Sequence, residues 1–132
     1  MVVPTNVNLT LDDGNMDEGT LGTGSFTVTR SNDGNVDAAI NVYFTFGGTA
    51  LNGVDYDATA QGYVNGDTRF ITIPAGQLSA SSTITPRKDN LIEGEETIVF
   101  TLQPDNTTYT VGPDVQAEMV ISDDVTEVNL TL

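Results

Sequence analysis

The chain has 132 residues with 19 acidic and 4 basic side chains, a formal net charge of -15, and neither Cys nor His. Its length fits one domain with a core of its own, and the missing Cys and His exclude disulfide scaffolds, thiolate or imidazole metal sites and Ser/His/Asp triads. The negative charge repels phosphate backbones and anionic membrane surfaces, and no apolar run is long enough for a spanning helix, so we expect neither nucleic-acid binding nor membrane insertion.

Alternating apolar and polar residues predict seven strands along the chain. In chain order they centre on residues 7–11, 25–29, 40–46, 70–73, 82–85, 98–102 and 117–121. Turn residues such as Asn65-Gly66-Asp67 separate these stretches, and no stretch has the period of a three-turn helix. Pro86 indicates a strand end, an edge or a bulge, because proline cannot donate to a ladder. The sequence therefore predicts an all-β fold, an antiparallel β-sandwich of about seven strands.

One pentapeptide occurs twice. Val7-Asn8-Leu9-Thr10-Leu11 returns letter for letter at residues 128–132. Either two amphipathic strands agree by chance, or the second copy begins the first strand of a following, similar domain. We favour the second reading, with residues 1–125 as a single domain and residues 126–132 as a linker and the start of a following repeat.

The acidic residues are clustered next to turns and strand ends. The clusters are Asp12-Asp13, Asp17-Glu18, Asp55 with Asp57, Asp89 with Glu93, Glu95 and Glu96, and Asp123-Asp124. Two carboxylates about 4 Å apart repel each other by about 4 kcal/mol at an effective dielectric constant of 20. Loops at one end of a sandwich that bring several such groups together therefore favour a bound cation.

Five motifs in order resemble those of Calx-beta domains and cover about residues 7–125. They are Glu18-Gly19, the stretch 47–56 that begins Gly47-Gly48-Thr49-Ala50 and ends Asp55-Tyr56, Ile73-Pro74-Ala75-Gly76, the block 89–97 around Glu93-Gly94-Glu95-Glu96, and Ile121-Ser122-Asp123-Asp124. The resemblance implies a seven-stranded immunoglobulin-like sandwich, which senses Ca²⁺ in the sodium/calcium exchanger and forms tandem repeats in bacterial surface and secreted proteins. It implies an extracellular or cell-surface location within a larger exported protein. The implied partners are neighbouring repeats and an extracellular protein or glycan.

The resemblance also implies a Ca²⁺ site. The acids at its ligand positions are Glu18, Asp55, Asp89, Glu93, Asp123 and Asp124, and the carbonyl of Leu91 completes the shell of six to eight oxygens that Ca²⁺ takes. Two positions depart from the family pattern: Lys88 precedes Asp89, and Val125 follows Asp124. Both departures weaken the site, so we expect one ion or weak binding.

Each acidic position also has a structural reading. Asp55 and Glu93 fit side chains that accept backbone N–H bonds in loops, Asp12, Asp13 and Asp57 fit solvated turn acids, and Glu95 and Glu96 fit outward charges on a strand. The tyrosines and Phe100 fit core or sheet-face aromatics better than a sugar platform.

Two functions remain open. The first is a non-catalytic Ca²⁺-binding module, and the alternative is a metal-independent structural or adhesion spacer in which Lys88 replaces the cation. A carboxylate-pair hydrolase needs an acid and a base across a cleft, which a small sandwich does not offer, so we expect no enzyme activity.

Overall fold

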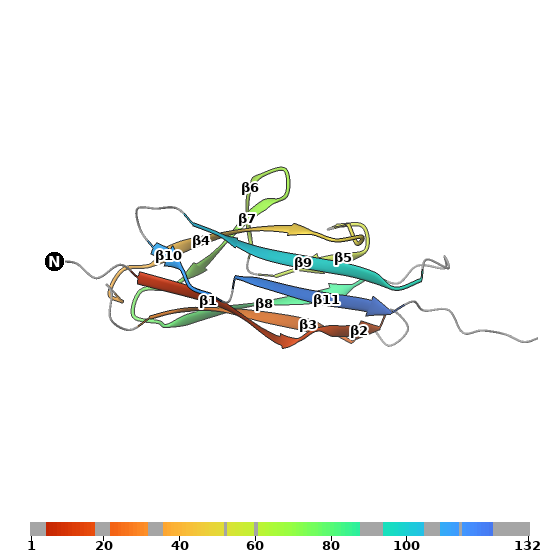
Figure 1. Cartoon of the computed structure of the whole chain (residues 1–132), viewed down its shortest axis with the longest axis horizontal. Helices are drawn as coiled ribbons and strands as arrows, with labels where there is room; N and C mark the ends of the chain where they lie inside the picture. Colours follow the sequence, from red (N-terminus) through yellow and green to blue (C-terminus); the bar gives the residue numbers. More distant parts are fainter. Residues whose placement is uncertain are drawn as a thin grey trace, which may run out of the picture.

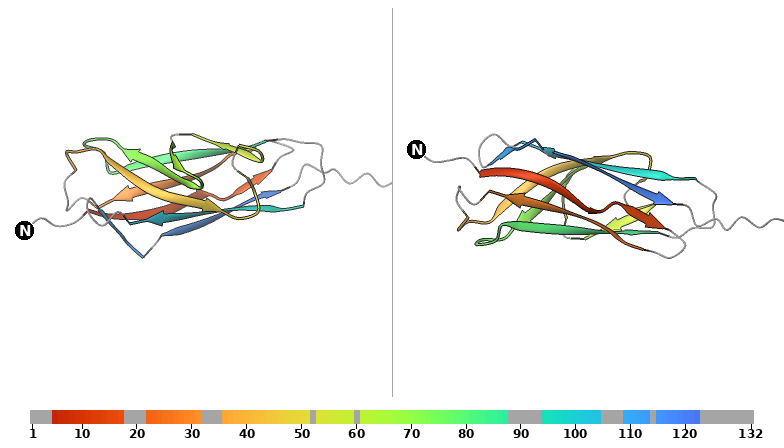
Figure 2. Two further views of the ribbon diagram at one scale, coloured as in Figure 1. Left: turned by 90° about the horizontal axis from the view of Figure 1, so that it is seen from above. Right: turned by 60° about the horizontal axis from the view of Figure 1, so that its bottom comes forward.

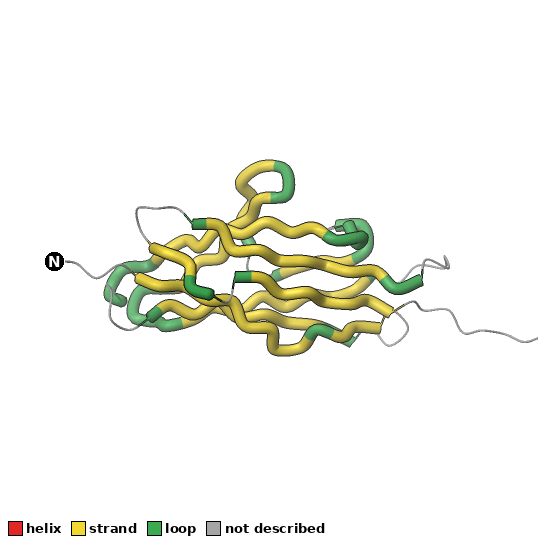
Figure 3. The backbone as a smooth tube through the Cα atoms, viewed as in Figure 1, coloured by secondary structure: helices red, strands yellow, loops and turns green. Residues whose placement is uncertain are grey.

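The computed structural model describes residues 5–17, 22–31, 36–51, 53–59, 61–87, 94–104, 109–113 and 115–122. These residues form two stacked β-sheets (Figures 1 and 3). The strands are β1 (Thr5–Asp13), β2 (Asn15–Asp17), β3 (Gly24–Arg30), β4 (Ile40–Gly47), β5 (Tyr56–Ala58), β6 (Gly62–Asn65), β7 (Thr68–Ile73), β8 (Ser79–Pro86), β9 (Glu96–Gln103), β10 (Tyr109–Val111) and β11 (Gln116–Ser122). None of the described residues forms a helix, so no membrane-spanning helix occurs among them.

One sheet has the strand order β10-β1-β3-β8-β5, and the other has the order β2-β11-β9-β4-β7-β6. The seven stretches predicted from alternation correspond to the seven longer strands β1, β3, β4, β7, β8, β9 and β11. The predicted all-β, immunoglobulin-like sandwich is therefore confirmed. Pro86 is the last residue of β8, as expected of a residue that cannot donate to the ladder.

Four short strands were not predicted. β2, β5, β6 and β10 have only three or four residues each. A stretch of this length has no measurable alternation, and it becomes a strand because a longer neighbour supplies its backbone partners. β2 and β10, for example, pair in parallel with β11 and β1, which come from distant parts of the sequence.

The core lies between the two sheets. Phe26 on β3 meets Phe100 on β9 and Phe44 on β4, with ring centroids 4.5 and 5.6 Å apart. All three rings are fully buried. Edge and tilted contacts of this kind add to the burial of apolar area, so this cluster joins the two sheets. Phe100, Tyr56 and Tyr109 are core aromatics as expected, whereas the Tyr63 side chain is 68% exposed.

A buried arginine closes one end of the sandwich. Arg30, at the end of β3, is only 2% exposed. Its guanidinium donates to the carbonyls of Gln77, Ala38, Val36 and Pro74 at 2.7–2.9 Å. These bonds replace water around the charge and tie β3 to the loops before β4 and β8.

Candidate metal centre

The opposite end of the sandwich contains Asp55 and the strand ends that several other predicted ligands follow in the sequence. β2 and β11 end there side by side, with Asp17 opposite Ser122, and β9 begins there with Glu96 opposite Ile121. β4, β8 and β11 all run toward this end, and the turn containing Asp55 lies there too, at the right of Figure 1 and in both views of Figure 2. We call it the Asp55 end.

The loop after β4 is fixed to the start of β9. Thr49 N–H donates to Thr97 Oγ1 at 3.2 Å, Thr97 N–H donates to Thr49 Oγ1 at 2.8 Å, and Ala50 N–H donates to the Thr97 carbonyl at 2.9 Å. Gly48 has a φ of 96°, and a Cβ there would lie 2.3 Å from the Thr97 carbonyl oxygen. Only glycine allows this approach, so the Gly48-Thr49-Ala50 motif has a structural role.

Asp55 is a buried carboxylate at the end of this loop. Its Oδ2 accepts the Leu51 N–H at 2.7 Å, while its own N–H donates to the Leu51 carbonyl at 2.8 Å. Gly53, with a φ of 82°, donates to the Tyr56 carbonyl and completes the turn. The Asp55 side chain is 7% exposed, and its Oδ1 has no hydrogen-bond partner within the described ranges. The backbone-bonding role considered for Asp55 is therefore present, and one carboxylate oxygen remains for a further ligand.

Asp55 also holds the chain that leads to Lys88. The Arg87 N–H donates to the Asp55 carbonyl at 2.8 Å. The Arg87 side chain forms a bidentate ion pair with Asp57, in which Nε donates to Oδ2 at 2.7 Å and Nη2 donates to Oδ1 at 2.6 Å. These bonds hold the pKa of the Asp57 carboxyl below its usual range. Asp57 is exposed, as expected of a solvated acid, but it lies in strand β5 and pairs with Arg87, so its expected place in a turn is wrong.

Glu96 differs from its expected position. It was expected to point outward from a strand, but it is 9% exposed and is the first inward residue of β9. The alternation contained this signal, because Glu96, Ile98, Phe100 and Leu102 share one face at a period of two. Glu95 is exposed. A second buried carboxylate therefore lies next to Thr97, the residue to which the loop before Asp55 is bonded.

Of the six predicted ligands, the described ranges contain Asp55 alone. Glu18, Asp89, Glu93, Asp123 and Asp124 lie outside them, as do Lys88, Leu91 and Val125. Within the described residues, no three acidic side chains come together in a way that could hold a metal ion. Carboxylate oxygens such as those of Asp55 and Glu96 suit a hard cation, but a full Ca²⁺ shell needs more oxygens than they supply. The boundary predicted near residue 125 and the second pentapeptide also lie outside the described residues.

No family model matches the sequence, and no curated protein matches it. Solved structures do match the fold. The apo-form Calx CBD1 domain superposes with a TM-score of 0.61 at 20% identity, over 90% of this chain and 98% of that one. The Calx CBD2 domain gives a TM-score of 0.53 at 14% identity, over 87% and 85%.

The calcium-binding domain CBD12 of CALX1.1 gives a TM-score of 0.60 at 19% identity. The match covers 88% of this chain, which spans 44% of that larger protein. Identities this low establish a shared fold. The resemblance stated from five sequence motifs is thus confirmed at the level of architecture: the chain has the fold of the Calx calcium-binding domains.

Proposed function

We propose that the chain is a non-catalytic Ca²⁺-binding module, one repeat of a larger secreted or cell-surface protein. In this proposal Ca²⁺ is held at the Asp55 end by Asp55 together with Glu18, Asp89, Glu93, Asp123 and Asp124. The observation that carries it is the buried Asp55 carboxylate, which is fixed through Oδ2 and keeps Oδ1 for another ligand. The shared fold with calcium-binding domains supports it.

The strand ends support the remaining ligands. Glu18 directly follows β2, Asp123 directly follows β11, and Asp89 lies three residues after the end of β8. All three strands end at the Asp55 end. Because β11 also ends there, a cation at this position would lie beside the connection to a following repeat. Ca²⁺ would then stiffen both the loops and that connection, which is the role we assign to it.

A calcium titration followed by thermal unfolding tests the proposal. Ca²⁺ at one hundred times its Kd adds about 2.7 kcal/mol to the free energy of unfolding. At about 3 °C per kcal/mol for a chain of this size, the melting temperature in Ca²⁺ should exceed that in EDTA by about 8 °C. Equal melting temperatures, together with no calorimetric heat at millimolar Ca²⁺, would refute the proposal.

Two variants make this test specific. Asp55→Asn keeps an oxygen for the Leu51 N–H but removes the charge, so it should abolish most of the calcium-dependent shift. Glu118→Gln removes one charge from an exposed position four residues before the end of β11, about 13 Å along the strand. It should leave the shift unchanged. If both variants lose the shift equally, overall charge rather than a site controls stability.

The alternative is a metal-independent spacer. It is supported by Arg87, a basic residue that is bonded at the Asp55 end. Arg87 is bonded to Asp55 through its backbone and to Asp57 through its side chain, and Lys88 follows it directly. In this alternative the Lys88 ammonium replaces Ca²⁺ among the acids. Lys88→Asp should then create calcium binding that the wild type lacks, whereas a saturable wild-type site would exclude the alternative.

A further inference from the structure

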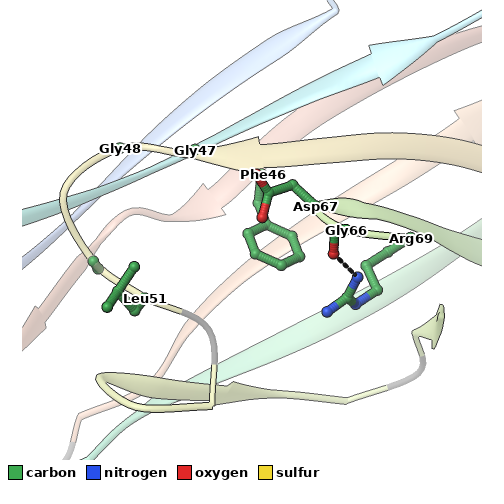
Figure 4. A pocket seen from close by; sticks show the side chains of 8 residues that line it. Phe46, Gly47, Gly48, Leu51, Gly66, Asp67 and Arg69 are labelled. Carbon is green, nitrogen blue, oxygen red and sulfur yellow. Dashed lines mark hydrogen bonds between the residues drawn. The ribbon is translucent and has the colours of Figure 1, made fainter. Parts of the chain in front are cut away.

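A pocket of about 300 Å³ opens where the end of β4 faces the turn between β6 and β7 (Figure 4). Its walls come from three segments: the end of β4 with Phe46 and Gly48, the following loop with Leu51, and the turn with Gly66, Asp67 and Arg69. The volume suits a small organic group. The pocket is lined by neither Asp55 nor Glu96, but it adjoins the candidate metal centre, because Leu51 lines the pocket and its N–H donates to Asp55 Oδ2.

Arg69 is held in one orientation in this pocket. Its guanidinium carbon lies 4.6 Å from the centroid of the Tyr63 ring and 4.8 Å from that of Phe46. Its Nη1 donates to the carbonyls of Gly66 and Thr68 at 2.8 and 3.1 Å. Cation–π contacts and two hydrogen bonds restrict the rotamers of a long side chain, so a ligand would not need to order it.

One edge of this guanidinium has no acceptor in the described part of the chain. The hydrogen bonds of Arg69 are made by Nη1, and its Nε and Nη2 have no described partner. Figure 4 shows the bond from the Arg69 guanidinium to the Gly66 carbonyl and no other hydrogen bond from this guanidinium to the residues drawn. Arg87 uses the same Nε and Nη2 edge to bind the Asp57 carboxylate. The matching ligand for the Arg69 edge is therefore a carboxylate, whose two oxygens fit the fork.

The other arginines in the described ranges are engaged. Arg30 is bonded to the carbonyls of four loop residues, and Arg87 is paired with Asp57. Asp67 lines the same pocket as Arg69 and is exposed, and no ion pair joins the two within the described residues. Asp67 weakens the binding of a simple anion to Arg69, whereas a carboxylate with a neighbouring hydroxyl or ammonium group would satisfy both side chains.

We propose that this pocket binds a small carboxylate that carries an adjacent hydrogen-bond donor, with Arg69 holding the carboxylate and Asp67 accepting from the donor. α-Hydroxy acids, α-amino acids and acidic sugars share this chemistry. Binding is weak at low ionic strength, because the net charge of -15 opposes the approach of any anion.

NMR of the ¹⁵N-labelled protein in EDTA tests the pocket without involving calcium. The probes are sodium acetate, its neutral isostere acetamide, and sodium glycolate, which adds one hydroxyl to acetate. Each is added at constant ionic strength up to about 100 mM, where a ligand with a Kd of about 10 mM is about nine-tenths bound. Sodium glucuronate and glycine, in separate titrations, distinguish a sugar source of the carboxylate from an amino-acid source.

We expect glycolate and acetate to shift the Arg69 Nε–H signal saturably, with glycolate binding more tightly, and acetamide to leave it unchanged. The Arg87 Nε–H signal is an internal control and should not move, because Asp57 already occupies it. Arg69→Lys keeps the charge but loses the paired Nε and Nη2 donors, so the affinity for acetate and glycolate should fall about tenfold. Asp67→Asn should remove the preference for glycolate over acetate.

Three results would overturn the proposal. They are equal shifts with acetamide and acetate, shifts that do not saturate, and unchanged acetate or glycolate affinity in Arg69→Lys. Because all titrations are done in EDTA, a negative result here leaves the calcium proposal untouched. A failed calcium titration likewise has no bearing on this pocket.

Discussion

Replacing Asp55 by alanine or by asparagine separates its structural role from its charge. In the folded protein, Asp55 Oδ2 accepts the Leu51 N–H at 2.7 Å from a side chain that is 7% exposed. Asp55→Ala removes this acceptor and leaves a poorly solvated N–H without a partner. A charge-assisted hydrogen bond contributes about 1.5–3 kcal/mol, so Asp55→Ala should lower the free energy of unfolding by about 2–3 kcal/mol in EDTA.

Asp55→Asn should cost less, about 1 kcal/mol, because the amide oxygen still accepts the Leu51 N–H. Urea unfolding in EDTA, followed by tyrosine fluorescence and circular dichroism, measures the free energy of unfolding of both variants. The comparison requires that the slope of this free energy against urea concentration is the same as in the wild type. If both variants lose only about 0.5 kcal/mol or less of the free energy of unfolding, the reasoning is refuted, because the Leu51 hydrogen bond then does not stabilise the loop. If Asn costs as much as Ala, the charge itself, rather than the acceptor, holds the turn.

Three further predictions follow from particular contacts. Gly48→Ala would place a Cβ 2.3 Å from the Thr97 carbonyl oxygen at a positive φ, so it should cost about 3 kcal/mol in urea unfolding, whereas Gly47→Ala, with nothing within 4 Å, should cost about 1 kcal/mol or less. Arg30→Met should destabilise by about 3–5 kcal/mol in the same assay, because four loop carbonyls lose the buried guanidinium that binds them; a loss under about 1 kcal/mol would mean that water replaces the guanidinium. Arg87 holds the pKa of the Asp57 carboxyl below its usual range by hydrogen bonding, so the pair stabilises above the unfolded pKa and is lost as pH falls through the folded one. NMR titration of the Asp57 carboxyl carbon should show its pKa rising in Arg87→Gln, and an unchanged pKa would mean that the pair does not persist in solution.

Glu96 shows how a short pattern can be misread. Together with its neighbour Glu95 it was expected to be an outward charge on a strand, although it has the same parity as Ile98 and Phe100. Alternation assigns a face only when the strand limits are known, and strand limits depend on a partner. The pairing of Glu96 with Ile121 of β11 supplies that limit and turns the carboxylate inward.

The Arg69 pocket has a similar origin. In the sequence, Arg69 is one residue of a strand next to a turn, and nothing there marks it as different from Arg87. Its environment is made by Phe46 of β4 and Tyr63 of β6, which reach it through the pairing of β7 with both neighbours. Contacts across strands of this kind have no signature in local sequence.

The sequence by itself determined the all-β class, the seven longer strands and the Gly48-Thr49-Ala50 and Asp55 motifs. These features depend on local alternation, turn chemistry and backbone geometry, which are properties of neighbouring residues. Only the tertiary structure decided the short edge strands, the inward position of Glu96, the Arg87–Asp57 pair and the placement of Arg69 against Phe46 and Tyr63. Each of these joins residues far apart in the chain, and long-range pairing sets their burial and hydrogen bonding.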